Sequence, residues 1–424
     1  MLSRLRFIQI GDIHLPSAAQ SKGALDDKDA RFPSDLKTII SNTPIKQAFR
    51  KIYELVESGE IAGLVIMGDL TDFGKIDGYA ACARYISTAF QVGANGQHSD
   101  MPLGIIPGNH DVDRALAKNA SFTAKFKPLV AALANEGLPS IPVTDPIWLT
   151  FSAGGIAVRL VLLNSCWGCG SKEFIPDEFR DDVQDAIEKA LSRGQPDKQI
   201  AAYYDRQFDT PAFSNDTIEK LLNAIPNASD CPVLVVAAHH NLLPQRLTRL
   251  APYTELVNSG AVRGALQELD VPVLYLHGHI HEDPIELLQR PGGNVVATIA
   301  APEIVKGFNV IELVFTRTSL PLTCRIIKWR FDQGGYLKQQ KPVTIPLIGS
   351  RRRSHNDSLA PLYSLLLKHR ELYWNQLKEE AKAIFASNVE EELEEALELL
   401  FSDGRIEIYN YELASYNWIV GARV

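Results

Sequence analysis

The stretch Leu64-Val-Ile-Met-Gly-Asp-Leu-Thr-Asp72 decides how this chain folds. An apolar run of strand length ends at a glycine, and the carboxylate of Asp69 follows directly. Glycine has no Cβ and lets the backbone turn sharply at this point. Because an open α/β sheet presents ligands at the carboxyl ends of its strands, the pattern predicts a buried strand that delivers Asp69 to a site.

The same pattern recurs in four further stretches of the chain. They are Phe7–His14, Leu103–Asp111, Val233–His240 and Val271–His281. Each apolar run ends in aspartate, asparagine or histidine, and in four of the five a glycine stands at the turn. Strand ends that converge on one place would pool two aspartates, one asparagine and at least four histidines. The sequence therefore predicts a metal site.

The chemistry of these side chains indicates which ions they hold. Carboxylate, imidazole and amide oxygen suit Mn, Fe, Zn or Co better than an ion that prefers thiolate. Seven such ligands are too many for one open catalytic ion and fit two. A shared carboxylate holds two ions roughly 3.5–4 Å apart, the spacing of two-metal phosphoryl-transfer sites. Asp69, on a central strand between the other motifs, is the candidate bridge.

Length and composition describe an ordinary globular protein. The 424 residues have room for two or three domains, and 46% are hydrophobic and 22% charged. A net charge of −8 offers no broad positive field for nucleic acid or anionic lipid. The first strand begins close to Met1 and no apolar run is long enough to span a bilayer. We therefore expect a cytoplasmic protein without a membrane segment.

Cysteine usage agrees with a reducing compartment. Of the five cysteines, Cys82, Cys231 and Cys324 stand alone in apolar surroundings typical of buried thiols. Cys166 and Cys169 form an isolated C-x-x-C motif, and a zinc ribbon would need a second such pair, which the sequence lacks. We interpret them as small residues in a glycine-rich loop, with a structural or redox role as the alternative.

Helical and strand patterns alternate through the first part of the chain, as in an α/β sheet with right-handed crossovers. A further strand is predicted over Ile156–Asn164. The polar segment Pro16–Asn42 and the irregular, aromatic-containing segment Cys166–Ser214 are expected to lie beside the site as walls, with packing of a satellite cluster as the alternative for the aromatic side chains. The helical spacings cover Pro44–Glu57, Tyr79–Phe90, Ala115–Asn135, Thr217–Ala224 and Gly260–Leu269.

Beyond His281 the pattern changes to closely spaced strands, which predict an antiparallel meander. These strands are Ile285–Gln289, Asn294–Ala300, Gly307–Phe315 and Leu322–Phe331. We place a first domain at 1–340, a linker at 341–358 and a small α+β domain at 359–424. The last contains a helical stripe over Leu359–Phe385, a helix over Val389–Phe401 and a hairpin over Arg405–Val420.

We expect this C-terminal domain to do no chemistry. Its outline loosely suggests a winged helix, but the acidic run Glu390–Glu398 argues against contacts with nucleic acid. Self-association or binding of a protein partner is the better expectation.

From Phe7 to about Phe315 the chain resembles the calcineurin-like metallophosphoesterases. It contains the blocks of that family in order, namely Asp12-Ile-His14, Gly68-Asp69, Gly108-Asn109-His110-Asp111, His239 and Gly278-His279-Ile-His281. The resemblance implies a four-layer α/β/β/α sandwich. The strands predicted beyond His281 are consistent with that fold. It also implies two metal ions, one held by Asp12, His14, Asp69 and His281, the other by Asp69, Asn109, His239 and His279.

The resemblance also implies roles for the remaining block residues. His110 would face the substrate phosphate and Asp111 would orient it. In the fourth block His240 stays open as the ligand in place of His239, because many relatives have a proline after the histidines and this chain has none until Pro244.

These observations predict a dinuclear metal-dependent phosphohydrolase, with Mn, Fe or Zn ions. A hydroxide bridging the ions would attack phosphorus, and His110 would assist the leaving oxygen. The block Gly68–Asp72 and the meander are most similar to the cyclic-nucleotide phosphodiesterase branch. Gly11–Leu15 is also similar to DNA-repair nucleases of the family, so a nuclease or a phosphomonoesterase is the alternative enzyme. The non-enzyme alternative is a scaffold that acts through its C-terminal domain.

Overall fold

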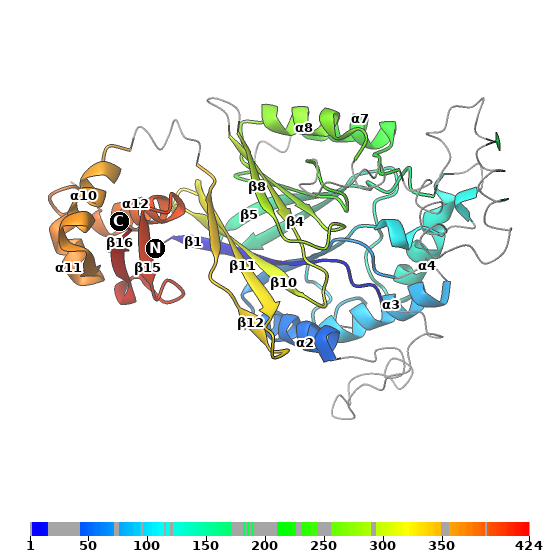
Figure 1. Cartoon of the computed structure of the whole chain (residues 1–424), viewed down its shortest axis with the longest axis horizontal. Helices are drawn as coiled ribbons and strands as arrows, with labels where there is room; N and C mark the ends of the chain where they lie inside the picture. The colour runs from blue at the N-terminus through cyan, green and yellow to red at the C-terminus, as the bar shows by residue number, and fades with distance from the viewer. Residues whose placement is uncertain are drawn as a thin grey trace.

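A computed structural model describes most of the chain. The described residues are 2–15, 43–71, 76–94, 96–113, 116–118, 122–170, 181–182, 185, 189, 210–225, 231–243, 256–289, 294–348, 356–385 and 388–423. Two sheets lie face to face, helices cover their outer faces, and a small C-terminal unit lies at one end (Figure 1). The predicted wall Pro16–Asn42 and most of Cys166–Ser214 fall outside the described residues.

The first sheet is built around β1 (Ser3–Ile10), which pairs in parallel with β2 (Ile61–Ile66) and antiparallel with β10 (Gly307–Phe315). Its strand order is β12-β11-β10-β1-β2-β3, with β13 also paired to β11. The remaining strands are β3 (Leu103–Ile105), β11 (Pro321–Phe331), β12 (Leu337–Gln339) and β13 (Val343–Pro346).

The second sheet has the order β4-β5-β6-β7-β9-β8. Neighbours from β5 to β9 are parallel, and the two edge strands β4 and β8 are antiparallel to theirs. The strands are β4 (Ile147–Ala153), β5 (Ile156–Leu162), β6 (Leu234–Ala237), β7 (Val273–His277), β8 (Ile285–Gln289) and β9 (Val295–Ala300).

Three apolar cores separate four layers. One core joins the first sheet to α2 (Thr43–Glu57), α3 (Ile76–Phe90) and α4 (Lys127–Asn135). A second lies between the sheets, and a third joins the second sheet to α7 (Asn215–Ala224) and α8 (Ser259–Glu268). The predicted α/β/β/α sandwich is thus confirmed. Within the described ranges, no helix combines the length and apolar character that crossing a membrane requires.

The predicted meander was wrong, because its strands divide between the two sheets. β8 and β9 form a hairpin in the second sheet, whereas β10 and β11 pair in the first. Every residue of β9 and of β10 is buried, so each strand needs neighbours inside a sheet and a core on both faces. β9 obtains its second neighbour by pairing in parallel with β7.

Three other expectations on local structure need correction. The stretch 115–135 forms the short 3₁₀ turns η2 (Leu116–Lys118) and η3 (Ala124–Phe126) before α4 begins, in place of one helix. The strand β4, which the sequence analysis missed, is largely half-exposed. Part of the expected linker 341–358 is strand β13, which pairs with β11 and so extends the first sheet.

The C-terminal unit has its own apolar core, formed around Trp374, Leu397 and Trp418. The stripe 359–385 is two helices rather than one, because the chain turns at Arg370 with φ of 64° and forms the short strand β14 (Glu371–Tyr373). The other elements are α10 (Leu359–His369), α11 (Trp374–Ala381), α12 (Val389–Ser402), β15 (Ile406–Tyr409), η6 (Ser415–Asn417) and β16 (Ile419–Ala422), with sheet order β14-β16-β15.

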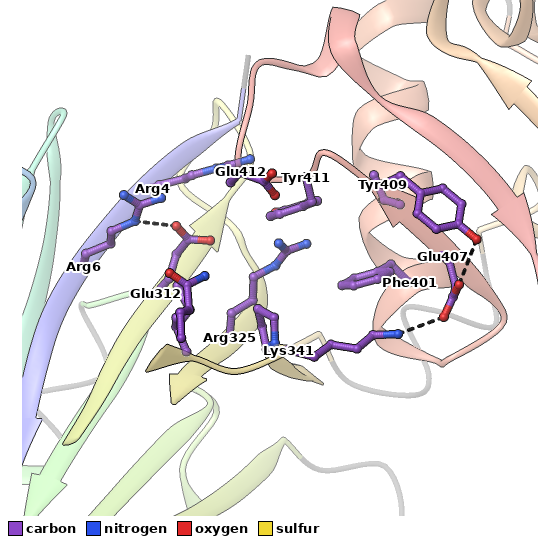
Figure 2. Close-up of a pocket in the computed structure, with 14 residues that line it drawn as sticks. Arg4, Arg6, Glu312, Arg325, Lys341, Phe401, Glu407, Tyr409, Tyr411 and Glu412 are labelled. Carbon is purple, nitrogen blue, oxygen red and sulfur yellow. Dashed lines mark hydrogen bonds and ion pairs between the residues drawn. The ribbon is translucent and has the colours of Figure 1, made fainter. Parts of the chain in front are cut away.

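A buried polar contact joins this unit to the first sheet. The Arg325 guanidinium on β11 donates to both carboxylate oxygens of Glu398 on α12, each at 3.1 Å, and both side chains are buried. Thr323 and Tyr411 donate to the same carboxylate at 2.6 and 2.8 Å. An adjoining cavity has a volume of about 180 Å³, and Arg4, Arg325 and Tyr411 are among the side chains that line it (Figure 2). The Arg4 guanidinium lies 4.8 Å from the Tyr411 ring centroid. The unit is therefore held by more than its covalent connection.

Candidate metal centre

The candidate ligands leave the two sheets at the same end. Asp12 and His14 follow β1, Asp69 follows β2, and Asn109 begins the short turn η1 (Asn109–Asp111) that follows β3. From the second sheet, β6 delivers His239 and β7 delivers His279 and His281. The five strand ends predicted from the sequence are therefore brought together from both sheets.

One group of ligand atoms comprises Asp12, His14, Asp69 and His281, all within 4.8 Å of one another. His281 Nε2 lies 3.1 Å from an oxygen of Asp12 and 3.3 Å from His14 Nε2. His14 Nε2 is 3.9 Å from Asp69 Oδ2. Imidazole nitrogens and carboxylate oxygens this close together form the donor set of a divalent transition metal.

A second group adjoins the first through Asp69. Asn109 Oδ1 lies 3.2 Å from both His239 Nε2 and His279 Nδ1. His239 Nε2 is 3.3 Å from Asp69 Oδ2, the oxygen that also faces His14. The carboxylate of Asp69 therefore lies between the two groups, where a shared ligand of two ions would stand.

Electrostatics at the centre favour a cation. Burial lowers the pKa of His239, but the carboxylates of Asp69 and Asp12 outweigh it and raise that pKa to about 10. Burial raises the pKa of Asp69, but His239, His110 and His14 hold it well below its ordinary value. Two buried carboxylates that demand positive charge, beside nitrogen and amide oxygen donors, fit a pair of divalent ions.

The backbone bends around these ligands in unusual conformations. His14, Asp69, His279 and His281 all have positive φ, between 47° and 65°. Gly108 packs against Asp69 so closely that a Cβ there would lie 2.0 Å from Asp69 Oδ1. Residues with side chains occupy the left-handed region rarely, and such positions concentrate at functional sites.

Asp111 positions the loops that carry the ligands. Its carboxylate accepts backbone N–H groups of Gly108, Leu70 and Thr71 at 2.9–3.1 Å, and thereby ties the loop after β2 to the loop after β3. Burial and the neighbouring Asp69 raise the pKa of Asp111 to about 7, although these backbone groups act against the rise. The resemblance implies that Asp111 orients His110, whereas these three contacts are with the backbone of Gly108, Leu70 and Thr71.

His110 lies at the edge of the centre. Its backbone N–H donates to Asp69 Oδ1 at 2.9 Å, while its partly exposed ring contacts the His14 ring edge-on at 5.0 Å between centroids. The side chain is thus left near the centre, within reach of solvent.

The geometry distinguishes His239 from His240. His239 is held by the Met67 carbonyl, 2.6 Å from its Nδ1, and contacts both Asn109 and Asp69. His240 instead places Nδ1 2.8 Å from the Ser165 hydroxyl. His239 thus makes contacts with Asn109 and Asp69, whereas the ligand atoms of His239, His240 and His279 all lie within 4.8 Å of one another.

Sequence reasoning missed two residues that support His281. Glu303, in the loop after β9, places a carboxylate oxygen 3.9 Å from His281 Nδ1, and Lys306 Nζ donates to the His281 carbonyl at 2.8 Å. The carboxylates of Asp12 and Glu303 both raise the pKa of His281. An acidic residue directly after a strand, as in Ala301-Pro-Glu303, was the available signal.

A family model described as calcineurin-like phosphoesterase matches residues 5–283. The chain therefore belongs to this family, and it is a hydrolase of phosphate esters. The family uses a dinuclear metal centre and acts on small phosphoester substrates, in agreement with the two groups of candidate ligands. No curated protein matches the chain.

Several solved structures resemble the fold at low identity. A dimetal phosphatase from Danio rerio is 14% identical, with a TM-score of 0.44 over 81% of this chain and 99% of its own. The NAD nucleotidase of Haemophilus influenzae is 11% identical, with a TM-score of 0.41 over 85% and 56% of the two chains. Purple acid phosphatase PPD1 from yellow lupin is also 11% identical, with a TM-score of 0.41 over 82% and 54%.

Proposed function

We propose that this protein is a phosphodiesterase for a small phosphodiester or a cyclic nucleotide, and that it uses two ions of Mn, Fe or Zn. The observation that carries the proposal is the place of Asp69, whose Oδ2 lies 3.3 Å from His239 Nε2 and 3.9 Å from His14 Nε2. We assign the first ion to Asp12, His14, Asp69 and His281, and the second to Asp69, Asn109, His239 and His279.

Residues of the chain would supply positioning and proton transfer, and the ions would supply the rest of the chemistry. When bound, the two ions supply Lewis acidity toward the phosphate oxygens and a nucleophile at neutral pH. Asp111 keeps the two ligand loops in register through its three backbone contacts. His110, partly exposed beside His14, is placed to donate a proton to the leaving oxygen.

The charge of the molecule favours a small substrate over nucleic acid. With a net charge of −8, the chain as a whole repels a polyanion such as duplex DNA. A single phosphodiester is attracted instead by the ions of the centre. The protein would therefore discriminate against duplex DNA through repulsion by its net charge, and would bind a small phosphodiester through attraction by the ions.

The test is a panel of substrates given to the full chain loaded in turn with Mn, Fe and Zn. It includes p-nitrophenyl phosphate, bis(p-nitrophenyl) phosphate, cyclic nucleotides and duplex DNA. We expect the highest kcat/KM on a small diester or a cyclic nucleotide, with no turnover by the Asp69→Ala variant. A higher kcat/KM on DNA, or on the monoester, would replace this proposal with a nuclease or a phosphomonoesterase.

A further inference from the structure

A second cluster of metal-ligating side chains lies beside the candidate centre. The ligand atoms of Cys166, Cys169 and His240 are all within 4.8 Å of one another, and the three side chains are fully buried. The cysteines follow β5 and His240 follows β6, its parallel neighbour in the second sheet. Two strand ends thus bring the isolated C-x-x-C motif against an imidazole that is distant in the sequence.

We propose that Cys166, Cys169 and His240 bind a third metal ion, of the thiophilic class that Zn²⁺ represents. Cys166 Sγ lies 4.0 Å from His240 Nδ1. With Zn–S near 2.3 Å and Zn–N near 2.0–2.1 Å, tetrahedral coordination separates sulfur from nitrogen by about 3.6 Å. A shift of a few tenths of an ångström brings the observed pair to that separation.

The loop around the cysteines is built to hold them together. The Cys169 N–H donates to the Cys166 carbonyl at 3.1 Å and closes the turn between them, and the Cys166 N–H donates to Asn164 Oδ1 at 2.9 Å. Ser165 Oγ, 2.8 Å from His240 Nδ1, also accepts the His240 N–H at 3.0 Å. The hydroxyl thus lies beside the same ring nitrogen that faces Cys166 Sγ.

A buried cation lies against the same loop. The Lys125 ammonium is 1% exposed and donates to the carbonyls of Trp167 and Cys169, the latter at 2.7 Å. Its positive charge therefore lies against the loop that carries both sulfurs.

The two kinds of site would select different ions. The candidate dinuclear centre offers carboxylate, imidazole and amide oxygen, whereas this cluster offers two sulfurs. Soft thiolates select zinc and similar ions, and oxygen ligands select harder ones. The third ion would be structural, since the His240 ring packs against those of His239 and His279. By fixing the His240 ring, it would restrict the movement of His239 and His279, which we assign to the second ion.

Cobalt substitution tests the proposal in the full chain. Metal-free protein is titrated with Co²⁺, and absorbance is followed in the near ultraviolet, where thiolate-to-cobalt charge transfer appears. We expect this band in the wild type and its loss in C166S/C169S, since the candidate dinuclear centre contains no thiolate ligand. The matched controls Cys82→Ser and Cys324→Ser, which replace buried thiols elsewhere, should retain the full band.

Elemental analysis gives a second readout. Protein purified with zinc should hold one zinc ion more per chain in the wild type than in C166S/C169S. Absence of the near-ultraviolet band from the wild type, which needs no variant to fold, would overturn the proposal. So would a band that persists in C166S/C169S, or a Cys166–Cys169 disulfide in protein purified without oxygen. Activity on phosphate esters enters none of these outcomes, so the proposed function is tested separately.

Discussion

Single residues at the candidate centre are held in conformations that the fold alone does not favour. His14, Asp69, His279 and His281 have positive φ, and each such residue costs on the order of 1–3 kcal/mol. Glycine or asparagine would occupy these positions at lower cost. The residues present instead are those that offer a metal an oxygen or a nitrogen, so the local strain coincides with the proposed chemistry.

Removing the Asp69 carboxylate should empty both metal positions. Its Oδ2 faces His239 in one group and His14 in the other, so Asp69→Ala takes a ligand from each ion and abolishes activity. Elemental analysis of the purified variant measures this loss. Asp145→Ala, which removes an exposed carboxylate paired with Lys220, should keep its metals. Full metal occupancy in Asp69→Ala would refute the bridging role.

Removing the His110 ring should spare the metals and slow the reaction. The contact of this residue with Asp69 is made by its backbone N–H, which His110→Ala retains. Metal content should therefore match the wild type, while kcat falls roughly 10²–10⁴-fold, the range for loss of a general acid. Steady-state kinetics with elemental analysis check both parts. Loss of metal, or unchanged kcat, would contradict the assignment.

At the scale of helices and strands, the positions of the strands could be predicted from the sequence. The sheet in which each strand pairs could not, because it depends on the neighbouring strand. The strands that end at Ile10 and Ile66 were readable because each is an apolar run that stops at a glycine. The division of β9 and β10 between two sheets was not readable, since a strand buried on both faces looks the same in either sheet.

The candidate site shows the same limit. His239 and His240 are adjacent in the sequence, and only the contacts with Asn109 and Ser165 separate their positions. The meeting of His240 with the C-x-x-C loop was invisible for a related reason, because the partner comes from another strand. Ligand types were thus predictable from the sequence, and ligand grouping required three dimensions.

Gly63 on β2 sets how closely the two sheets approach. A Cβ at this position would lie 2.2 Å from the Phe151 ring of β4, so Gly63→Ala should destabilise the protein by about 1–3 kcal/mol through overpacking. Gly264→Ala in α8, where nothing lies within 4 Å, should instead stabilise it by roughly 0.5–1 kcal/mol. Urea unfolding measures both, and equal stability of the two variants would exclude this role for Gly63.

Across the whole molecule, Glu398 joins the C-terminal unit to the sandwich. Glu398→Ala leaves the buried guanidinium of Arg325 without its carboxylate and should cost about 3–5 kcal/mol. Denaturant unfolding followed by two probes, near-ultraviolet circular dichroism and metal release, measures the loss. Glu407→Ala breaks exposed pairs with Lys341 and Arg423 and should change stability little. Similar unfolding of both variants would show that the buried pair contributes no more than an exposed one.

The pairing of β1 also determines when the first sheet can be completed during protein synthesis. β1 gains its parallel neighbour β2 early, but the register that sets Ser3 opposite Phe315 leaves its other edge open until the ribosome has passed β10. The Asp12 carbonyl receives its backbone bond from Ile304 equally late. Contacts so distant in sequence slow folding and prolong exposure of an unpaired edge. The first sheet is therefore completed around β1 only after translation has passed β10.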